Sequence, residues 1–169
     1  MKKILILIVT CVFFVQCGYH LRGTGSFLPS HIKRVNVPMF RNSTTRFELD
    51  LKLTHSVIDE LVARGKVDIA EDVKNADAVL IGEIISFRAI PIAVSREASA
   101  DRYNIIVVTS ITFKDLVTNK VIFSNPNFRY QTEYGVPEGT DFETMESEAL
   151  DSIAVKFARS LVTNILEGF

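Results

Sequence analysis

The segment that decides the fold spans residues 103–115 and reads YNIIVVTSITFKD. Every second position in it, from Tyr103 to Phe113, is aromatic, aliphatic or β-branched. Because successive side chains of a β-strand point to opposite faces, this alternation predicts a long strand with one buried face. The expected buried row consists of Tyr103, Ile105, Val107, Thr109, Ile111 and Phe113.

The segments on either side of this strand are also β-rich. Residues 79–94 carry many β-branched side chains, and simple alternation places Arg88 on the same face as Leu80 and Ile84. After Phe113, the sequence Thr118-Asn119-Lys120 indicates a hairpin turn into residues 121–134, which are interrupted at Asn125-Pro126. The three segments therefore predict a meander of long antiparallel strands that is half buried.

Two helices are expected around the meander. Thr45 and Glu48 have the spacing of a capping box, and apolar residues recur at helical spacing from Phe47 until Gly65. Residues 140–143 repeat the capping-box spacing before a second apolar stretch, whose acidic residues crowd its start as the helix dipole favours. The face expected to be buried on the first helix comprises Phe47, Leu51, Thr54, Ile58 and Leu61, with Leu49, Leu53 and Val57 beside them.

Shorter elements complete the expected fold. Residues 32–38 read as a strand that stops at Pro38, residues 39–44 as a polar connection, and residues 66–70 as a short edge strand. The order of elements is then strand, helix, three or four strands, helix. We expect an α+β fold in which two helices pack on one face of a mostly antiparallel four- to five-stranded sheet.

The N-terminal residues have the layout of an export signal. Lys2 and Lys3 precede the apolar run 4–15, which is shorter than the roughly 20 residues of a membrane span. Cys17 follows this run. In one interpretation a lipoprotein signal peptidase cuts before Cys17, whose acyl chains then anchor the protein. In the other, Cys17 is an ordinary residue near the end of a plain signal peptide, because Gln16 is larger than the residue usual at that position.

The first interpretation defines the expected organisation of the chain. Residues 1–16 would be removed as a lipoprotein signal peptide, residues 17–30 would form a lipidated tether, and residues 31–169 would form a single α+β domain. The only other cysteine is Cys11, so a disulfide framework is excluded as a source of stability.

Composition and motifs argue against two large classes of function. The 19 basic and 20 acidic residues are balanced, and no run of lysine or arginine is present, so nucleic acid is not an expected partner. His20, His31 and His55 lie in different elements without the spacing of metal ligands. No nucleophile elbow or other catalytic motif is present, so we expect neither an enzyme, nor a metal site, nor a cofactor.

Basic side chains on the long strands are the remaining candidates for a binding site. Arg88, Lys114 and Arg129 lie on the predicted meander, with Arg96 and Arg102 beside it. They are either the charges of a solvated outer sheet face or a set of donors for anionic phosphates, to which arginine presents a fork of N–H groups. The sequence alone leaves open which of them share a face.

Several strings resemble those of the lipopolysaccharide-assembly lipoproteins (LptE, also called rare lipoprotein B). The opening Cys17-Gly18-Tyr19-His20-Leu21-Arg22-Gly23 is similar to that family's Cys-Gly-aromatic-His-Leu-Arg. The segments 35–44 and 76–84 and the acidic-to-basic final helix match the family in kind and order. The likeness extends over nearly the whole chain.

This resemblance implies an outer-membrane lipoprotein that faces the periplasm and is acylated at Cys17. It implies a place inside a large β-barrel partner of the LptD type, where the protein assists the insertion of lipopolysaccharide as a plug and a lipopolysaccharide-binding subunit. Arg88, Lys114 and Arg129 are then the candidate lipid contacts. The alternatives are a lipoprotein that carries another periplasmic ligand or assists a transporter, and an enzyme such as a cell-wall hydrolase.

Overall fold

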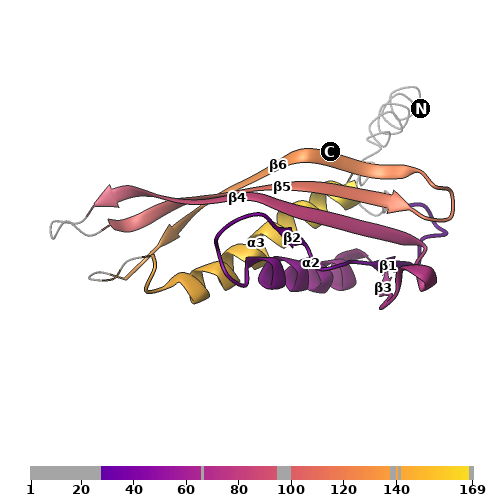
Figure 1. Cartoon of the computed structure of the whole chain (residues 1–169), viewed down its shortest axis with the longest axis horizontal. Coiled ribbons are helices and arrows are strands. Elements are labelled where there is room, and N and C mark those ends of the chain that lie inside the picture. The colour runs from indigo at the N-terminus through magenta and orange to yellow at the C-terminus, as the bar shows by residue number, and fades with distance from the viewer. Residues whose placement is uncertain (1–27, 66, 95–99, 138–139, 141, 168–169) are drawn as a thin grey trace, which may run out of the picture.

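The computed structural model describes residues 28–65, 67–94, 100–137, 140 and 142–167. It contains a six-stranded sheet and two long helices, α2 (Leu49–Gly65) and α3 (Glu146–Glu167). Both helices lie on the same side of the sheet and pack against each other (Figure 1). The α+β fold with a mostly antiparallel sheet is therefore confirmed.

Three strands make up most of the sheet: β4 (Ala78–Val94), β5 (Ala100–Asp115) and β6 (Val121–Gly135). They form the predicted antiparallel meander, in the order β4-β5-β6. In the turn between β5 and β6, Asn119 adopts a φ of 58°, a left-handed conformation that asparagine tolerates better than most residues. The N–H of Asp115 donates to the carbonyl oxygen of Lys120 at 2.8 Å and closes this turn.

Three short strands extend the sheet on the other side of β4. They are β1 (Arg34–Asn36), β2 (Arg41–Asn42) and β3 (Asp68–Ile69), and β1 pairs in parallel with both β3 and β4. The segment containing β2 was expected to be only a polar connection. It pairs with β4 through its backbone, with Arg41 opposite Glu83, so its polar side chains carry no pattern that would mark a strand.

The buried row of β5 is the predicted one. All six expected residues, from Tyr103 to Phe113, are buried, with exposed fractions between 0% and 9%. The prediction for β4 is wrong beyond its midpoint, because a register shift between Ile84 and Ser86 inserts one extra residue. Such a bulge reverses which side chains face the core. The core-facing row therefore runs through Leu80, Gly82 and Ile84 and then changes to Phe87 and Ala89.

The predicted helix starts are also wrong. α2 begins at Leu49, and Phe47 is 90% exposed rather than part of the core. The reason is that side chains hold the preceding loop: Thr44 Oγ1 accepts the N–H of Arg46 at 3.2 Å, and Asn42 Nδ2 donates to the carbonyl oxygen of Arg46 at 2.8 Å. Such bonds compete with helical ones.

At the second helix, α3 starts at Glu146, after the expected capping box. Phe142 is nonetheless fully buried in the turn that precedes it. Its ring contacts those of Phe87, Tyr103 and Tyr134, with centroids 5.5–6.2 Å apart. The apolar pattern therefore located a core segment correctly but placed the first turn of the helix too early.

The core lies between the helices and the sheet. Phe157 of α3 packs edge-on against Phe128 and Tyr130 of β6, at centroid distances of 5.8 and 6.0 Å. In the first part of β4, the ring of Phe40 lies directly over Gly82, where a Cβ atom would come within 2.7 Å of the ring carbons. A larger residue at position 82 would displace Phe40, so the glycine is needed for this close approach.

Candidate functional site

The face of the sheet opposite the helices, called the outer face below, carries the basic residues that the sequence singled out. It consists of the side chains of β4, β5 and β6 that point away from α2 and α3. Arg88 and Arg129 are both exposed on it. Isoleucines of β4 accompany them, since Ile81 is 52%, Ile85 43% and Ile90 40% exposed. The outer face is therefore amphiphilic, with long cations set among aliphatic side chains.

The register of the strands shows which basic residues lie together. Arg88 is opposite Ile106, and Arg129 is opposite Val108, two residues further along β5. At a strand spacing of about 4.8 Å and a rise of about 3.3 Å per residue, the Cα atoms of the two arginines lie about 12 Å apart. Both guanidinium groups can reach one ligand across β5. Ile106, which lies between Arg88 and Gln131, is only 4% exposed.

Lys114 lies on the same face but apart from this pair. It pairs with Val79 and Val121 near the β5–β6 turn, six positions from Val108 along β5. That separation corresponds to about 20 Å along the strand. Among the other basic residues, Arg102 Nη1 lies 3.9 Å from Glu133 Oε2, whereas Arg96 and Cys17 lie outside the described residues.

Hydrogen-bonding groups surround the arginine pair. Arg129 Nη2 donates to Gln131 Oε1, a neutral acceptor, at 3.3 Å. Among the described residues, no acidic side chain forms an ion pair with Arg129. Asn104 Oδ1 is buried and has no hydrogen-bond partner within the described part of the chain. A shallow depression of about 500 Å³ adjoins it, lined by Ile92, Asn104, Gln131, Thr132 and Glu133. The outer face thus offers charged donors, amide groups and apolar surface side by side.

A second polar cluster lies at the end of the sheet where the described chain begins. Asp115 Oδ2 is 2.7 Å from His31 Nε2, and the same carboxylate accepts hydrogen bonds from Thr118 and from the backbone N–H of Val117. The hydroxyl of Thr118 is the largest of the influences that hold the pKa of Asp115 well below its ordinary range. The cluster fastens the entering chain to the β5–β6 turn, which is a structural role.

The remaining histidines form no such cluster within the described part of the chain. His55 is exposed on α2, and His20 lies outside the described residues. Among the described residues, no three His, Cys, Asp or Glu side chains are placed to hold a metal ion. Nor does that part of the chain contain a helix long and apolar enough to cross a membrane.

Sequence reasoning missed the role of Arg46. Its guanidinium lies 3.1 Å from Glu146 Oε1 and 3.9 Å from Glu143 Oε1, and 5.7 and 5.9 Å from the ring centroids of Phe87 and Phe142. It joins the loop before α2 to β4 and to the start of α3. No signal in the sequence could have indicated these contacts, because the residues of the Arg46–Glu146 pair are 100 positions apart.

The family model for lipopolysaccharide assembly, LptE, matches residues 32–165, well over half of the chain. The chain belongs to the LptE family. The predicted family is therefore confirmed. No curated protein matches the chain in sequence.

Several solved structures have a fold similar to that of this chain, although their sequence identity to it is low. The hypothetical protein CT253 of Chlamydia trachomatis is similar with a TM-score of 0.55 and 12% identity, over 82% of this chain and 97% of that one. The PelC dodecamer of Paraburkholderia phytofirmans has a TM-score of 0.52 and 20% identity, over 85% and 95%. The rare lipoprotein B of Shewanella oneidensis has a TM-score of 0.50 and 15% identity, over 79% and 93%.

Proposed function

We propose that this LptE-family protein is a non-enzymatic outer-membrane lipoprotein, anchored through acylated Cys17 and facing the periplasm. It forms a complex with a β-barrel translocon of the LptD type and serves there as plug and lipopolysaccharide-binding subunit. In this proposal residues 1–16 are the removed signal peptide, residues 17–30 the lipidated tether and residues 31–169 the binding domain.

The observation that carries the lipid-binding part of this proposal is the composition of the outer face. Lipopolysaccharide combines anionic phosphates with long acyl chains. Arg88 and Arg129 supply charge-assisted donors for phosphate oxygens, and Ile81, Ile85 and Ile90 supply apolar surface for acyl chains within the same face. Lys114, about 20 Å away along β5, is proposed as a second and separate contact.

The test reverses the charge of the arginine pair. Arg88→Glu combined with Arg129→Glu is expected to weaken lipopolysaccharide binding by the purified domain at least about tenfold, because each lost charged hydrogen bond is worth about 1.5–3 kcal/mol. The melting temperature should hold, since both side chains are exposed. Binding is measured by titration with purified lipopolysaccharide, at low and high salt.

The matched control is Lys74→Glu combined with Arg159→Glu. It reverses the same number of exposed charges on the short 3-10 helix Val73–Asn75, which precedes β4, and on α3, away from the outer face. If both double variants bind equally well, the arginine pair is only a solvated surface. Recovery of the full-length protein from solubilised membranes without a barrel-sized partner would instead favour a lipoprotein that carries another ligand.

A further inference from the structure

Phe47 is unusual among the apolar side chains that the structure describes. At 90% exposure it is the most exposed of the large hydrophobic residues there, ahead of Val117 at 65%. A single exposed apolar residue is common on protein surfaces and needs no function. Phe47 calls for an explanation because the loop that carries it is unusually constrained.

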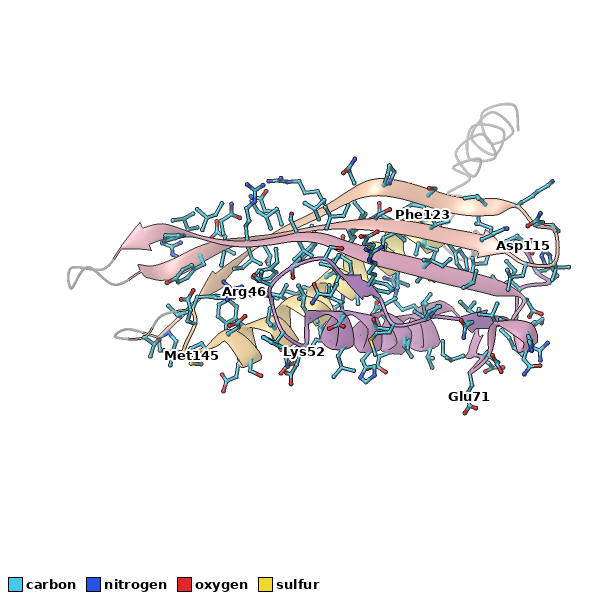
Figure 2. All side chains as sticks on the ribbon, in the orientation of Figure 1. Arg46, Lys52, Glu71, Asp115, Phe123 and Met145 are labelled. Atoms are coloured by element: carbon cyan, nitrogen blue, oxygen red, sulfur yellow. The ribbon has the colours of Figure 1, made fainter. Side chains whose placement is uncertain are left out.

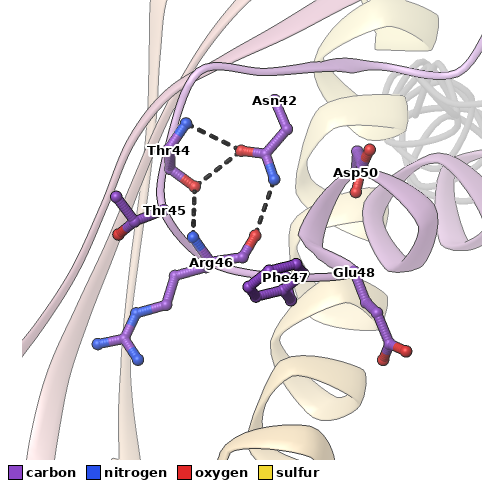
Figure 3. Close-up of a pocket in the computed structure, with 7 residues that line it drawn as sticks. All are labelled: Asn42, Thr44, Thr45, Arg46, Phe47, Glu48 and Asp50. Carbon is purple, nitrogen blue, oxygen red and sulfur yellow. Dashed lines mark hydrogen bonds between the residues drawn. The ribbon is translucent and has the colours of Figure 1, made fainter.

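Side chains of the loop hold its backbone in one conformation. Asn42 Oδ1 accepts the N–H and the hydroxyl of Thr44 at 3.0 and 2.7 Å, and both Asn42 and Thr44 bond the backbone of Arg46 (Figure 3). The N–H of Ser43 donates to the carbonyl oxygen of Ile84 at 3.0 Å, which fastens the loop to β4. The loop is therefore preorganised up to the residue before Phe47.

The residues on either side of Phe47 are fixed as well. The guanidinium of Arg46 is held by Glu146 and by the rings of Phe87 and Phe142. After Phe47, Glu48 adopts a φ of 57°, a conformation that residues other than glycine rarely adopt and that surrounding structure must maintain. Arg46 and Phe47 point in different directions in Figure 3, so the loop fixes the arginine against the domain while it displays the phenylalanine.

The surroundings of Phe47 are acidic. Depressions of about 430 and 370 Å³ adjoin the ring, and their linings include four carboxylates, those of Glu48, Asp50, Glu143 and Glu146, against the two cations of Arg46 and Lys52. Arg46 pairs with Glu146, and Lys52 pairs with Asp151. The excess negative charge is therefore carried by Glu48, Asp50 and Glu143, of which Glu143 is 66% exposed and lies 3.9 Å from Arg46. An anionic lipid surface would be repelled here, whereas a cation would be attracted by the carboxylates and by the open face of the ring.

We propose that Phe47 is the anchor of a protein-docking site that receives a basic segment of the barrel partner, with a lysine or arginine over the ring and near Glu48 and Glu143. The inference rests on the proposed function, which supplies the barrel. Preorganisation of the loop favours binding because little conformational freedom is lost when the partner docks. Aromatic side chains, phenylalanine among them, are enriched in the cores of protein interfaces.

The experiment uses the full-length protein, tagged and co-expressed with the barrel, and measures the barrel recovered after solubilisation and a salt wash. Phe47→Ala is expected to reduce this recovery at least about tenfold. Glu48→Lys combined with Glu143→Lys should reduce it as well, and more strongly as the salt concentration is lowered, because like charges then meet with less screening. Val117→Ala, at the other highly exposed apolar position, should leave recovery unchanged.

Photo-crosslinking identifies the occupant. With p-benzoylphenylalanine at position 47, the expected adduct joins the protein to a barrel peptide that contains lysine or arginine. Equal recovery of the barrel by Phe47→Ala and the wild type, or an adduct only to lipid or to a second copy of this chain, would overturn the inference and leave the proposed function standing. A wild-type protein that recovers no barrel would overturn the proposed function itself, and this inference with it.

Discussion

The two faces of the meander use the same three strands for different purposes. On the inner face of β5 every alternate side chain from Tyr103 to Phe113 is buried beneath the helices. On the outer face of β4, Ile81 and Ile85 remain about half exposed although they are as apolar as the residues of the core. The helices cover one side of the sheet, as Figure 2 shows, so the hydrophobicity of a strand residue does not by itself decide its burial, although Ile106 on the outer face is also buried.

This difference separates stability from binding. Burial of apolar surface beneath α2 and α3 supplies most of the folding free energy, whereas the outer face contributes little to it and is free to bind a ligand. A substitution on the inner face should therefore alter the unfolding transition, and one on the outer face should alter binding alone. The predictions below test that separation, starting with the largest effect.

Phe157→Ala should be the most destabilising of these changes. The ring of Phe157 is fully buried on α3 and packs edge-on against Phe128 and Tyr130. Removing it leaves a cavity between helix and sheet, for which we expect a loss of about 3–5 kcal/mol in the free energy of unfolding. Urea denaturation followed by circular dichroism measures this loss. Val155→Ala, at a 50% exposed position of the same helix, should change it by no more than about 0.5 kcal/mol.

Asp115→Asn tests whether the buried carboxylate at the end of β5 stabilises the fold. Asp115 follows Phe113 on the buried side of β5, and hydrogen bonds from Thr118 and Val117 depress its pKa. The ionised carboxylate therefore stabilises the fold above the ordinary aspartate pKa of about 3.9, and this contribution is lost as the pH falls toward the depressed value. The variant should melt at a lower temperature than the wild type at neutral pH, by less than Phe157→Ala does.

The pH profile distinguishes this account from simple loss of packing. The gap in melting temperature between the wild type and Asp115→Asn should narrow between about pH 5 and pH 2, because Asp115 of the unfolded wild-type chain becomes protonated there while the carboxylate of the folded protein stays ionised. A gap of constant size over that range would show that the charge of Asp115 is unimportant. Asp59→Asn, at an exposed position on α2, controls for the loss of one negative charge.

The inner face of β5 could be predicted from the sequence because its signal is local. The alternation from Tyr103 to Phe113 needs no knowledge of the partner strands, and the order of the elements followed from similar local patterns. The start of α2 was predicted too early. Asn42 and Thr44 bind the backbone of Arg46, and the helix therefore begins only at Leu49. The contact between Arg46 and Glu146 joins residues too distant in sequence for any local pattern to reveal.

The outer face was less predictable because its composition depends on register. The bulge between Ile84 and Ser86 has no glycine or proline to mark it, and it moves Arg88 away from the row of Leu80 and Ile84. Arg88 lies near Arg129 because of the way β4 pairs with β5 and β5 pairs with β6. The same pairing places Lys114 apart from both. The sequence identified the candidate residues, but the register was needed to group them.

Ile81→Ser should have the smallest effect on folding and is the sharpest test of the difference between the faces. Ile81 is 52% exposed and lies opposite Thr112 on the outer face, so its replacement should change the free energy of unfolding by no more than about 0.5 kcal/mol. If the outer face binds acyl chains, the same change should weaken lipopolysaccharide binding several-fold, because apolar contact area is lost. Binding of a deacylated lipopolysaccharide should not change. A substantial loss of stability would mean that the outer face belongs to the folding core, and the two faces would then not be functionally distinct.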